Sequence, residues 1–165
     1  MSEIRNAEID DLESIRELAC KIWPSAYEEI LGKEQLNYML DNIYSLSALQ
    51  HQFSVLKQHF IMVIENDTPI GFASFSAHDD PKFYHVNKLY VLPGEQGKNV
   101  GKQVLEYIIA EIKKAGATSL QLNVNRFNKA LHFYEKQGFK IIREEDIDIG
   151  EGYFMNDYVM EKKIN

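Results

Sequence analysis

The sequence of 165 residues has only one cysteine, Cys20, and no long hydrophobic run. A single cysteine excludes an intramolecular disulfide and is typical of a reducing cytoplasm. No segment approaches the roughly 18 apolar residues of a membrane-spanning helix, and residues 1–10 are too charged for a signal peptide. We therefore expect a cytoplasmic protein without membrane contact. Because Cys20 falls on an apolar helix stripe, we expect a buried structural thiol rather than a nucleophile.

The sequence also lacks an excess of basic residues, internal repeats, low-complexity segments and any linker that would mark a domain boundary. Its net charge of −7 argues against nucleic-acid binding, which would require a basic face. The same charge suits a cationic or amine-bearing partner better than an anionic one. The length favours a single domain, residues 1–165, that is large enough to bury a proper core.

Hydrophobic periodicity divides the chain into a helical first third and a sheet-rich remainder. Helices are expected at about residues 12–22, 25–31, 33–43, 45–57, 100–114 and 128–137, with Trp23-Pro24 interrupting the first of them. Strands are expected at about residues 3–9, 60–64, 70–75, 83–92, 119–124, 139–142 and 153–160. Helices first, then an antiparallel meander, then β-α-β-α-β-β, predict an α/β or α+β sheet domain.

One junction carries the parts of a phosphate-binding site. The apolar strand run Leu89–Leu92 stops at Pro93-Gly94, and a polar loop with glycines at 97 and 101 leads into an amphipathic helix. Backbone N–H groups in a first helical turn point at an anion, and the helix dipole favours negative charge there. Lys98 and Lys102 could add cationic donors. The loop has neither a Walker ending nor the spacing of a dinucleotide fingerprint, and by itself it could be an ordinary strand-turn-helix junction.

Two further stretches give this loop a specific meaning. Residues 96–101 read Gln96-Gly97-Lys98-Asn99-Val100-Gly101, and some thirty residues later the chain carries Asn128, Ala130, Tyr134-Glu135-Lys136 and Gly138-Phe139. Together these motifs resemble the GCN5-related N-acetyltransferase (GNAT) superfamily over about residues 60–162. A phrase in the first half, Ile22–Tyr27 with Glu34–Met39 and Tyr44-Ser45, looks like a bacterial subgroup near the polyamine acetyltransferase-like proteins.

The resemblance implies a GNAT fold, a mixed central sheet of about six or seven strands flanked by helices, and acetyl-CoA as cosubstrate without a metal. Residues 1–58 would form the acceptor side and residues 59–165 the acetyl-CoA-binding core. Asn128 would bind the cofactor through its side chain, and Tyr134 would protonate the leaving thiolate as general acid. The resemblance assigns cofactor binding to Leu89, Tyr90, Val91, Gln96, Gly97, Lys98, Asn99, Val100, Gly101, Lys102 and Asn128.

Asn99 departs from the family pattern, which has glycine in that slot. Asparagine tolerates positive φ best among the other residues, so we expect the loop geometry to be kept. Structural alternatives remain for the other positions. Tyr134 could be a core aromatic, Asn128 an N-cap, and Lys98 and Lys102 solvated charges.

The general base is the least defined member of the site. The family often places a carboxylate on the strand before the loop, but residues 83–88 contain none. His85 lies about where that group would be, and the ordinary pKa of histidine suits a base at neutral pH; it could equally be a half-exposed strand residue without a role. Glu28 and Glu29, on the acceptor side, are the alternatives.

The acceptor is not defined by the sequence. A small-molecule amine such as a polyamine, an amino acid or an aminoglycoside is expected, with a protein amine as an alternative. Tyr27, Tyr38 and Tyr44 could line an aromatic cleft or pack helices together. A monomer or homodimer is expected. The competing functions are a non-catalytic acyl-CoA sensor on the same fold and a regulatory or nucleic-acid-binding protein.

Overall fold

The computed structural model describes residues 2–164, and its contacts form two compact units. The first unit comprises residues up to Ser76 together with Asn87–Ile108, and the second comprises Ala77–Val86 together with the residues from Ile109 onward. The strand order is β1-β2-β3-β4-β5-β7-β6, with β4 (Phe83–Val91) contributing its first half to the second unit and its last half to the first. None of the helices of residues 2–164 has the length and hydrophobicity needed to cross a membrane.

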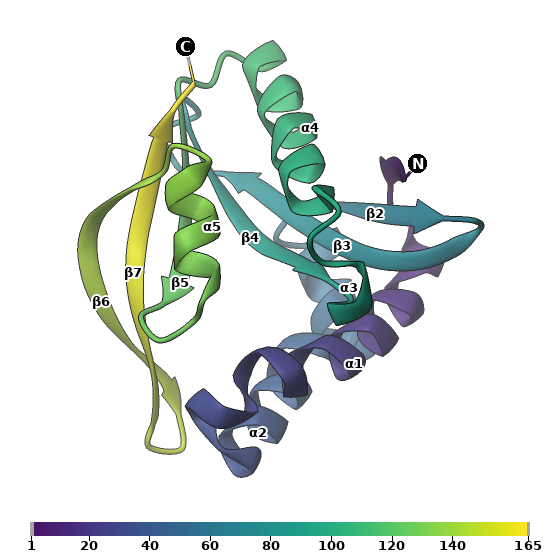
Figure 1. Ribbon diagram of the computed structural model, residues 1–165, viewed down its shortest axis with the longest axis vertical. Coiled ribbons are helices and arrows are strands. Elements are labelled where there is room, and N and C mark those ends of the chain that lie inside the picture. The colour runs from purple at the N-terminus through teal and green to yellow at the C-terminus, as the bar shows by residue number, and fades with distance from the viewer. Residues whose placement is uncertain (1, 165) are drawn as a thin grey trace. The chain divides into compact units, whose positions relative to one another are not determined.

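An antiparallel meander forms the sheet of the first unit (Figure 1). β1 (Glu3–Asn6) pairs with β2 (His59–Glu65), which pairs in turn with β3 (Thr68–Ala77). The turn between β2 and β3 consists of Asn66 and Asp67, both with positive φ. Asparagine and aspartate accept this conformation more readily than most residues, which explains why the hairpin turns at the predicted place.

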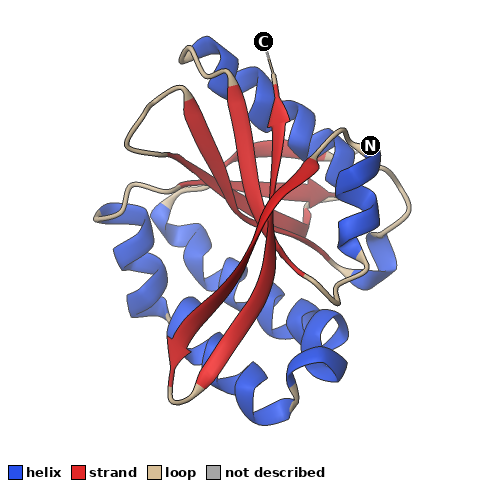
Figure 2. Cartoon of the chain, turned by 90° about the vertical axis from the view of Figure 1, so that its left-hand side faces the viewer, coloured by secondary structure: helices blue, strands red, loops and turns tan. Residues whose placement is uncertain are grey.

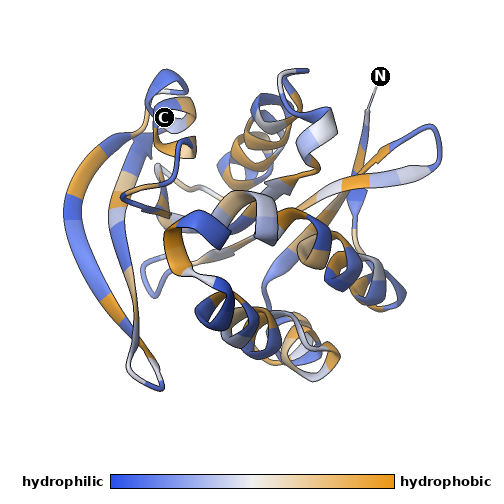
Figure 3. Ribbon diagram, turned by 60° about the horizontal axis from the view of Figure 1, so that its bottom comes forward, coloured by the Kyte–Doolittle hydropathy of each residue, from blue (hydrophilic) through white to orange (hydrophobic). Residues whose placement is uncertain are grey.

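Three helices separate β1 from β2 along the chain. They are α1 (Leu12–Leu31), α2 (Lys33–Tyr44) and α3 (Leu46–Ser54). The Ser45 hydroxyl caps α3 by accepting a hydrogen bond from the Ala48 N–H at 3.2 Å. A fourth helix, α4 (Val100–Lys114), buries Val104, Leu105, Ile108 and Ile112 on one stripe. Figure 3 shows polar and apolar residues alternating along the helices.

Two expectations for α1 are wrong. Pro24 lies inside one continuous helix rather than between two, although an interior proline costs about 3 kcal/mol. Trp23 and Tyr27 on either side of it are buried, and this aromatic burial offsets the cost. Cys20 is exposed rather than buried, because it follows Arg16 by one helical turn on the solvent face while the core stripe runs through Ala19.

The second unit contains the parallel β4–β5 pair and a long antiparallel hairpin. β5 (Ser119–Asn125) aligns with β4 from Phe83 beside Ser119 to Val86 beside Leu122. After β5 comes the short helix α5 (Ala130–Lys136), followed by β6 (Lys140–Gly150) and β7 (Tyr153–Lys163). β7 pairs with both β5 and β6. With β6 it forms a long hairpin, which is seen among the strands drawn in red in Figure 2.

β6 is much longer than the predicted strand, which ended at Ile142. It continues to Gly150 through Arg143, Glu144, Glu145 and Asp146. Acidic residues are depleted in strands, and their density concealed this extension. They are tolerated because β6 is mostly exposed along its length, where charged side chains remain hydrated.

Candidate active site

The loop before α4 has the backbone expected of an anion cradle. Gly97 has φ 85° and Asn99 has φ 62°, so Asn99 adopts the positive φ that was expected of it in place of glycine. Intrahelical bonding starts when the Gln103 N–H donates to the Asn99 carbonyl at 3.0 Å. The N–H groups of Val100, Gly101 and Lys102 therefore form the open first turn of α4, where the helix dipole favours an anion.

Side chains of the same loop hold it against the end of β4. The Gln96 amide donates to the Val91 carbonyl at 3.3 Å. Lys98 pairs with Glu95 at 2.9 Å on the surface, so this lysine is engaged by a carboxylate rather than being a solitary cation. An exposed pair of this kind contributes little to stability. Anion binding at this loop is therefore expected to depend on the backbone N–H groups rather than on Lys98.

The last residues of β4 are fixed from β3. Gly71 leaves so little room that a Cβ at this residue would stand 2.7 Å from the Tyr90 carbonyl oxygen. The Leu92 N–H donates to the Ile70 carbonyl at 2.8 Å. The Tyr90 hydroxyl lies 2.9 Å from that of Tyr27. Leu89–Val91, which the family resemblance assigns to cofactor binding, thus form a firmly held strand within the first unit.

Buried aromatic rings from several elements of the first unit surround Tyr90. Ring centroids lie 5.8 Å from Tyr90 to Trp23 and 5.8 Å from Tyr90 to Phe72, and Tyr44 packs edge-on against both Trp23 and Phe72. Tyr27 and Tyr44 are both buried. This favours the packing interpretation of these two tyrosines over the cleft interpretation. Glu28 and Glu29, the alternative bases, lie exposed on α1 in the same unit.

The remaining predicted residues lie in the second unit. Asn128 accepts a hydrogen bond from the Ala130 N–H through its side-chain oxygen at 2.9 Å, which closes a turn just before α5. The N-cap residue of α5 is Lys129, so the N-cap alternative for Asn128 is wrong by one residue. Tyr134 on α5 is 9% exposed, and its ring lies 5.2 Å from Phe133 and 5.8 Å from Phe139. The two residues stand at the entrance and in the body of the same short helix.

His85 is a half-buried member of β4 in the second unit. Burial, and to a lesser extent the nearby His78, whose ring centroid lies 5.3 Å away, lower the pKa of its imidazole from 6.5 to about 4. Its Nδ1 is buried without a hydrogen-bond partner among residues 2–164. A histidine in this state is neutral at physiological pH. Its pKa therefore lies well below the ordinary value that made His85 a candidate base in the sequence.

Sequence reasoning missed two polar residues on the face of the sheet that carries His85. Asn123 on β5 donates through its amide to Asp157 Oδ2 on β7 at 3.3 Å. Asp157 is only 6% exposed, and burial raises the pKa of its carboxyl group. The signal that could have identified it is the apolar and aromatic sequence on either side of Asn156-Asp157, since a buried charged residue needs a structural or functional reason.

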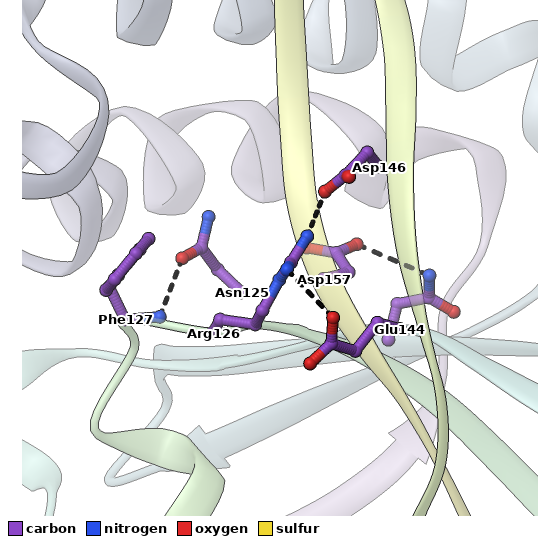
Figure 4. A network of polar contacts seen from close by, with 7 residues as sticks. Asn125, Arg126, Phe127, Glu144, Asp146 and Asp157 are labelled. Atoms are coloured by element: carbon purple, nitrogen blue, oxygen red, sulfur yellow. Dashed lines mark hydrogen bonds and ion pairs between the residues drawn. The ribbon is translucent and has the colours of Figure 1, made fainter.

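A polar network beside Asp157 is built on Arg126 (Figure 4). The Arg126 guanidinium bonds to Glu144 at 3.2 Å and to Asp146, both on β6. Its guanidinium carbon also lies 6.0 Å from the Tyr158 ring. These contacts attach the loop after β5 to the β6–β7 hairpin and explain how an acidic stretch of strand is stabilised.

Three comparisons with known proteins are consistent with this geometry. The family described as Acetyltransferase (GNAT) family matches residues 12–139. The spermidine N(1)-acetyltransferase of Thermoplasma acidophilum is 31% identical over 166 residues, covering 98% of this chain and 96% of that protein. The aminoalkylphosphonate N-acetyltransferase of Salmonella typhimurium is 26% identical over 144 residues, 84% of each chain. The crystal structure of the PaiA N-acetyltransferase from Thermoplasma acidophilum in complex with coenzyme A is similar over 99% of each chain, with a TM-score of 0.83 and 30% identity.

Proposed function

The chain belongs to the acetyltransferase (GNAT) family, and on that premise we propose that it transfers the acetyl group of acetyl-CoA to a primary amine of a small cationic molecule. The observation that carries the proposal is the loop before α4, where Gly97 and Asn99 both have positive φ and present the first turn of a helix to an anion. Asparagine accepts this conformation more readily than most residues, so the loop keeps the geometry that would hold the pyrophosphate of coenzyme A.

Binding of the donor would use two parts of the chain. Backbone groups of Leu89, Tyr90 and Val91 would pair with the pantetheine arm as an added strand, and residues 96–102 would hold the pyrophosphate. The Asn128 side chain would contribute a further hydrogen bond. Because most of these contacts come from the backbone, donor binding should depend on φ angles more than on side-chain charge.

Acetyl transfer would be direct. The acceptor enters as an ammonium ion, since an amine has a pKa near 10 and is mostly protonated at neutral pH. His85 removes a proton and leaves a neutral nitrogen, which attacks the thioester carbonyl. A carbon–nitrogen bond forms, and the nitrogen then loses its second proton to water. The carbon–sulfur bond breaks, and Tyr134 gives its phenolic proton to the departing thiolate and regains a proton from water. The products are an N-acetylated amine and coenzyme A.

A polyamine is the acceptor class that we favour. The relative that spans almost the whole chain is a spermidine N(1)-acetyltransferase, and the net charge of −7 attracts polycations. The second named relative acts on an aminoalkylphosphonate, whose phosphonate an acidic protein would repel. A comparison of these two acceptors therefore tests the electrostatic part of the proposal.

The test is a steady-state assay of purified protein with acetyl-CoA and a panel of amines, following thiol release and the mass of the acetylated product. Spermidine, spermine, 2-aminoethylphosphonate, an aminoglycoside and a peptide with a free N-terminal amine form the panel. We expect the highest kcat/KM with a polyamine, and a loss of that preference at high salt because screening weakens charge attraction.

Two outcomes would overturn the proposal at different levels. Turnover only with the peptide would place the acceptor among protein amines. Tight acetyl-CoA binding without turnover of any amine would support a sensor domain instead. The Tyr107→Phe variant serves as a control in this assay, because the Tyr107 hydroxyl donates to Asn6 in the first unit and has no role in the proposed chemistry.

A further inference from the structure

β6 forms one edge of the sheet, because within residues 2–164 its only strand partner is β7. The strand is 11 residues long, and its residues from Lys140 to Glu144, together with Asp146 and Asp148, are exposed. An exposed edge strand presents a row of backbone N–H and C=O groups with which another strand can pair. The free side of β6 is therefore a surface on which a further strand can add to the sheet.

Two bulges limit the regular part of β6. The pairing with β7 is irregular between Ile141 and Arg143 and again between Asp148 and Gly150. Within residues 143–148 the register is continuous, so successive side chains point to opposite faces of the sheet. A strand that pairs regularly with β6 therefore does so along this short segment.

The charges of this segment are arranged differently on the two faces. On one face Arg143 donates through Nε to Glu145 Oε1 at 2.8 Å. On the other face Glu144 and Asp146 both bond to the guanidinium of Arg126, which reaches them from the loop after β5. One face thus carries a positive and a negative charge side by side, whereas the two carboxylates of the other face are already matched with a cation.

A second copy of β6 is complementary to this pattern in one register. When two copies pair antiparallel about a two-fold axis perpendicular to the sheet, each residue meets a residue of the same face. Within residues 143–148, Glu145 is the only carboxylate on the face of Arg143. The two meet when the axis passes through Glu144, and symmetry then gives the contact twice. An axis through Glu145 would instead oppose the carboxylates of Glu144 and Asp146, which is unfavourable.

We propose that the protein forms a homodimer in which β6 pairs antiparallel with β6 of a second copy about Glu144. The Arg143–Glu145 pairs of the two strands then lie head to tail, and opposite charges on facing strands stabilise the pairing. The two Glu144 residues face each other on the axis, where like charges are unfavourable, but each remains bonded to Arg126 of its own copy. Because a two-fold contact uses the same strand of both copies, it closes and favours a dimer over a fibre.

Apolar side chains beside the charged segment add to this interface. Ile141 and Ile142, next to the first bulge, are 44% and 43% exposed, and antiparallel pairing brings them toward Ile147 of the second copy. Strand pairing over so few residues buries less than the ~1,200 Å² of a standard interface. We therefore expect a reversible dimer whose population rises with protein concentration. This association does not depend on which amine the protein acetylates.

Sedimentation velocity at increasing protein concentration measures the association. We expect the wild-type protein to dimerise, and Arg143→Glu to raise the dimer dissociation constant about 10-fold or more, since two attractive contacts become repulsive. Adding Glu145→Arg to that variant exchanges the two charges and should restore the association. Lys114→Glu is the matched control, because Lys114 forms a comparable exposed pair with Glu111 at 3.2 Å on α4, outside the proposed contact.

Cysteine cross-linking tests the register. Residues directly opposite each other in an antiparallel pair have Cα atoms about 4.5–5.5 Å apart, which is within disulfide range. Glu144→Cys, made in a Cys20→Ser background because Cys20 is exposed, should give a disulfide-linked dimer under mild oxidation. Lys140→Cys in the same background is the control. Residue 140 is exposed on the same strand, but its two copies would lie about 27 Å apart along the paired strands and should not cross-link.

A wild-type protein that stays monomeric at every concentration would overturn the inference. A dimer that Arg143→Glu leaves unchanged would overturn it as well, since the contact would lie elsewhere, and so would a charge-exchanged variant that fails to associate. Cross-linking at residue 140 in preference to residue 144 would exclude the register. Association that is lost in Arg143→Glu and regained on charge exchange, together with a disulfide at residue 144, supports antiparallel pairing about Glu144.

Discussion

The carbonyl oxygen of Tyr90 lies directly against the backbone of Gly71, so close that a Cβ at residue 71 would stand 2.7 Å from it. The strand that is proposed to bind pantetheine is thus positioned by the absence of a side chain on its neighbour. Glycine is needed at this residue because a side chain would clash with the Tyr90 carbonyl oxygen, and not because of its φ angle.

We therefore expect Gly71→Ala to move Tyr90 and the end of β4. Overpacking of this kind costs about 1–3 kcal/mol, so the melting temperature should fall and the KM for acetyl-CoA should rise. Gly94→Ala is the control, because a Cβ there meets nothing within 4 Å. Equal melting temperatures and equal KM values for the two variants would show that β4 does not depend on Gly71.

The left-handed conformation of Gly97 allows the effect of backbone strain on stability to be distinguished from an effect on acetyl-CoA binding. Gly97→Ala places an L side chain at φ 85°, which costs about 1–2 kcal/mol, and should weaken acetyl-CoA binding in calorimetry. Gly116→Ala introduces similar strain at φ 89°, again with open space around the Cβ, at the end of α4 outside the loop. Both variants should lose stability, and only Gly97→Ala should lose affinity. A matching loss of affinity in Gly116→Ala would contradict the prediction that the loop at Gly97 binds the pyrophosphate of acetyl-CoA.

Because Lys88 is buried, we predict that the stability of the protein varies with pH in the alkaline range. Its Nζ lies 3.2 Å from Gln58 Oε1 and 5.5 Å from the Phe60 ring centroid, and burial lowers its pKa from 10.5 to about 8. Between these pH values the unfolded chain holds a proton that the folded protein has released. The free energy of unfolding should therefore rise with pH in this window, by at most about 1.4 kcal/mol per pH unit. Denaturation of Lys88→Met across the same range should show a flatter dependence.

From the environment of His85 we predict that the stability also varies with pH in the acidic range. Because burial lowers its pKa from 6.5 to about 4, the folded protein stays neutral at His85 where the unfolded chain is protonated. Stability should decrease as the pH falls from about 6.5 to 4, and less steeply in His85→Gln. The His85 limb of the kcat/KM profile should likewise lie near pH 4. A limb near pH 6.5 that disappears in His85→Gln would contradict the buried environment.

Much of the fold was predictable because local signals agreed with it. The turn between the expected strands 60–64 and 70–75, the amphipathic helix after the glycine loop and the positive φ of Asn99 each had a local cause, and each is present. The comparisons confirm the expected GNAT family, its mixed α/β fold, the N-acetyltransferase class and acetyl-CoA as cosubstrate.

The errors arose where tertiary structure overrides local preference. Pro24 remains helical because the surrounding aromatic residues are buried. For Cys20, periodicity alone did not determine whether the residue lies within the apolar stripe or beside it, and the structure places it on the exposed face. Asp157 escaped notice for a related reason. Its importance depends on the pairing of β7 with β5, which brings it to Asn123, and no local pattern in the sequence records that pairing.

Tyr134→Phe tests the central claim most directly. The substitution removes one hydroxyl and keeps the ring that packs 5.8 Å from Phe139, so folding and the KM for acetyl-CoA should be preserved. With the preferred amine, kcat for thiol release should fall about 10²-fold to 10⁴-fold, the usual contribution of a general acid. Tyr107→Phe should retain wild-type kcat. A Tyr134→Phe protein that releases coenzyme A as fast as the wild type would contradict the assignment of Tyr134 as the acid of the acetyl transfer.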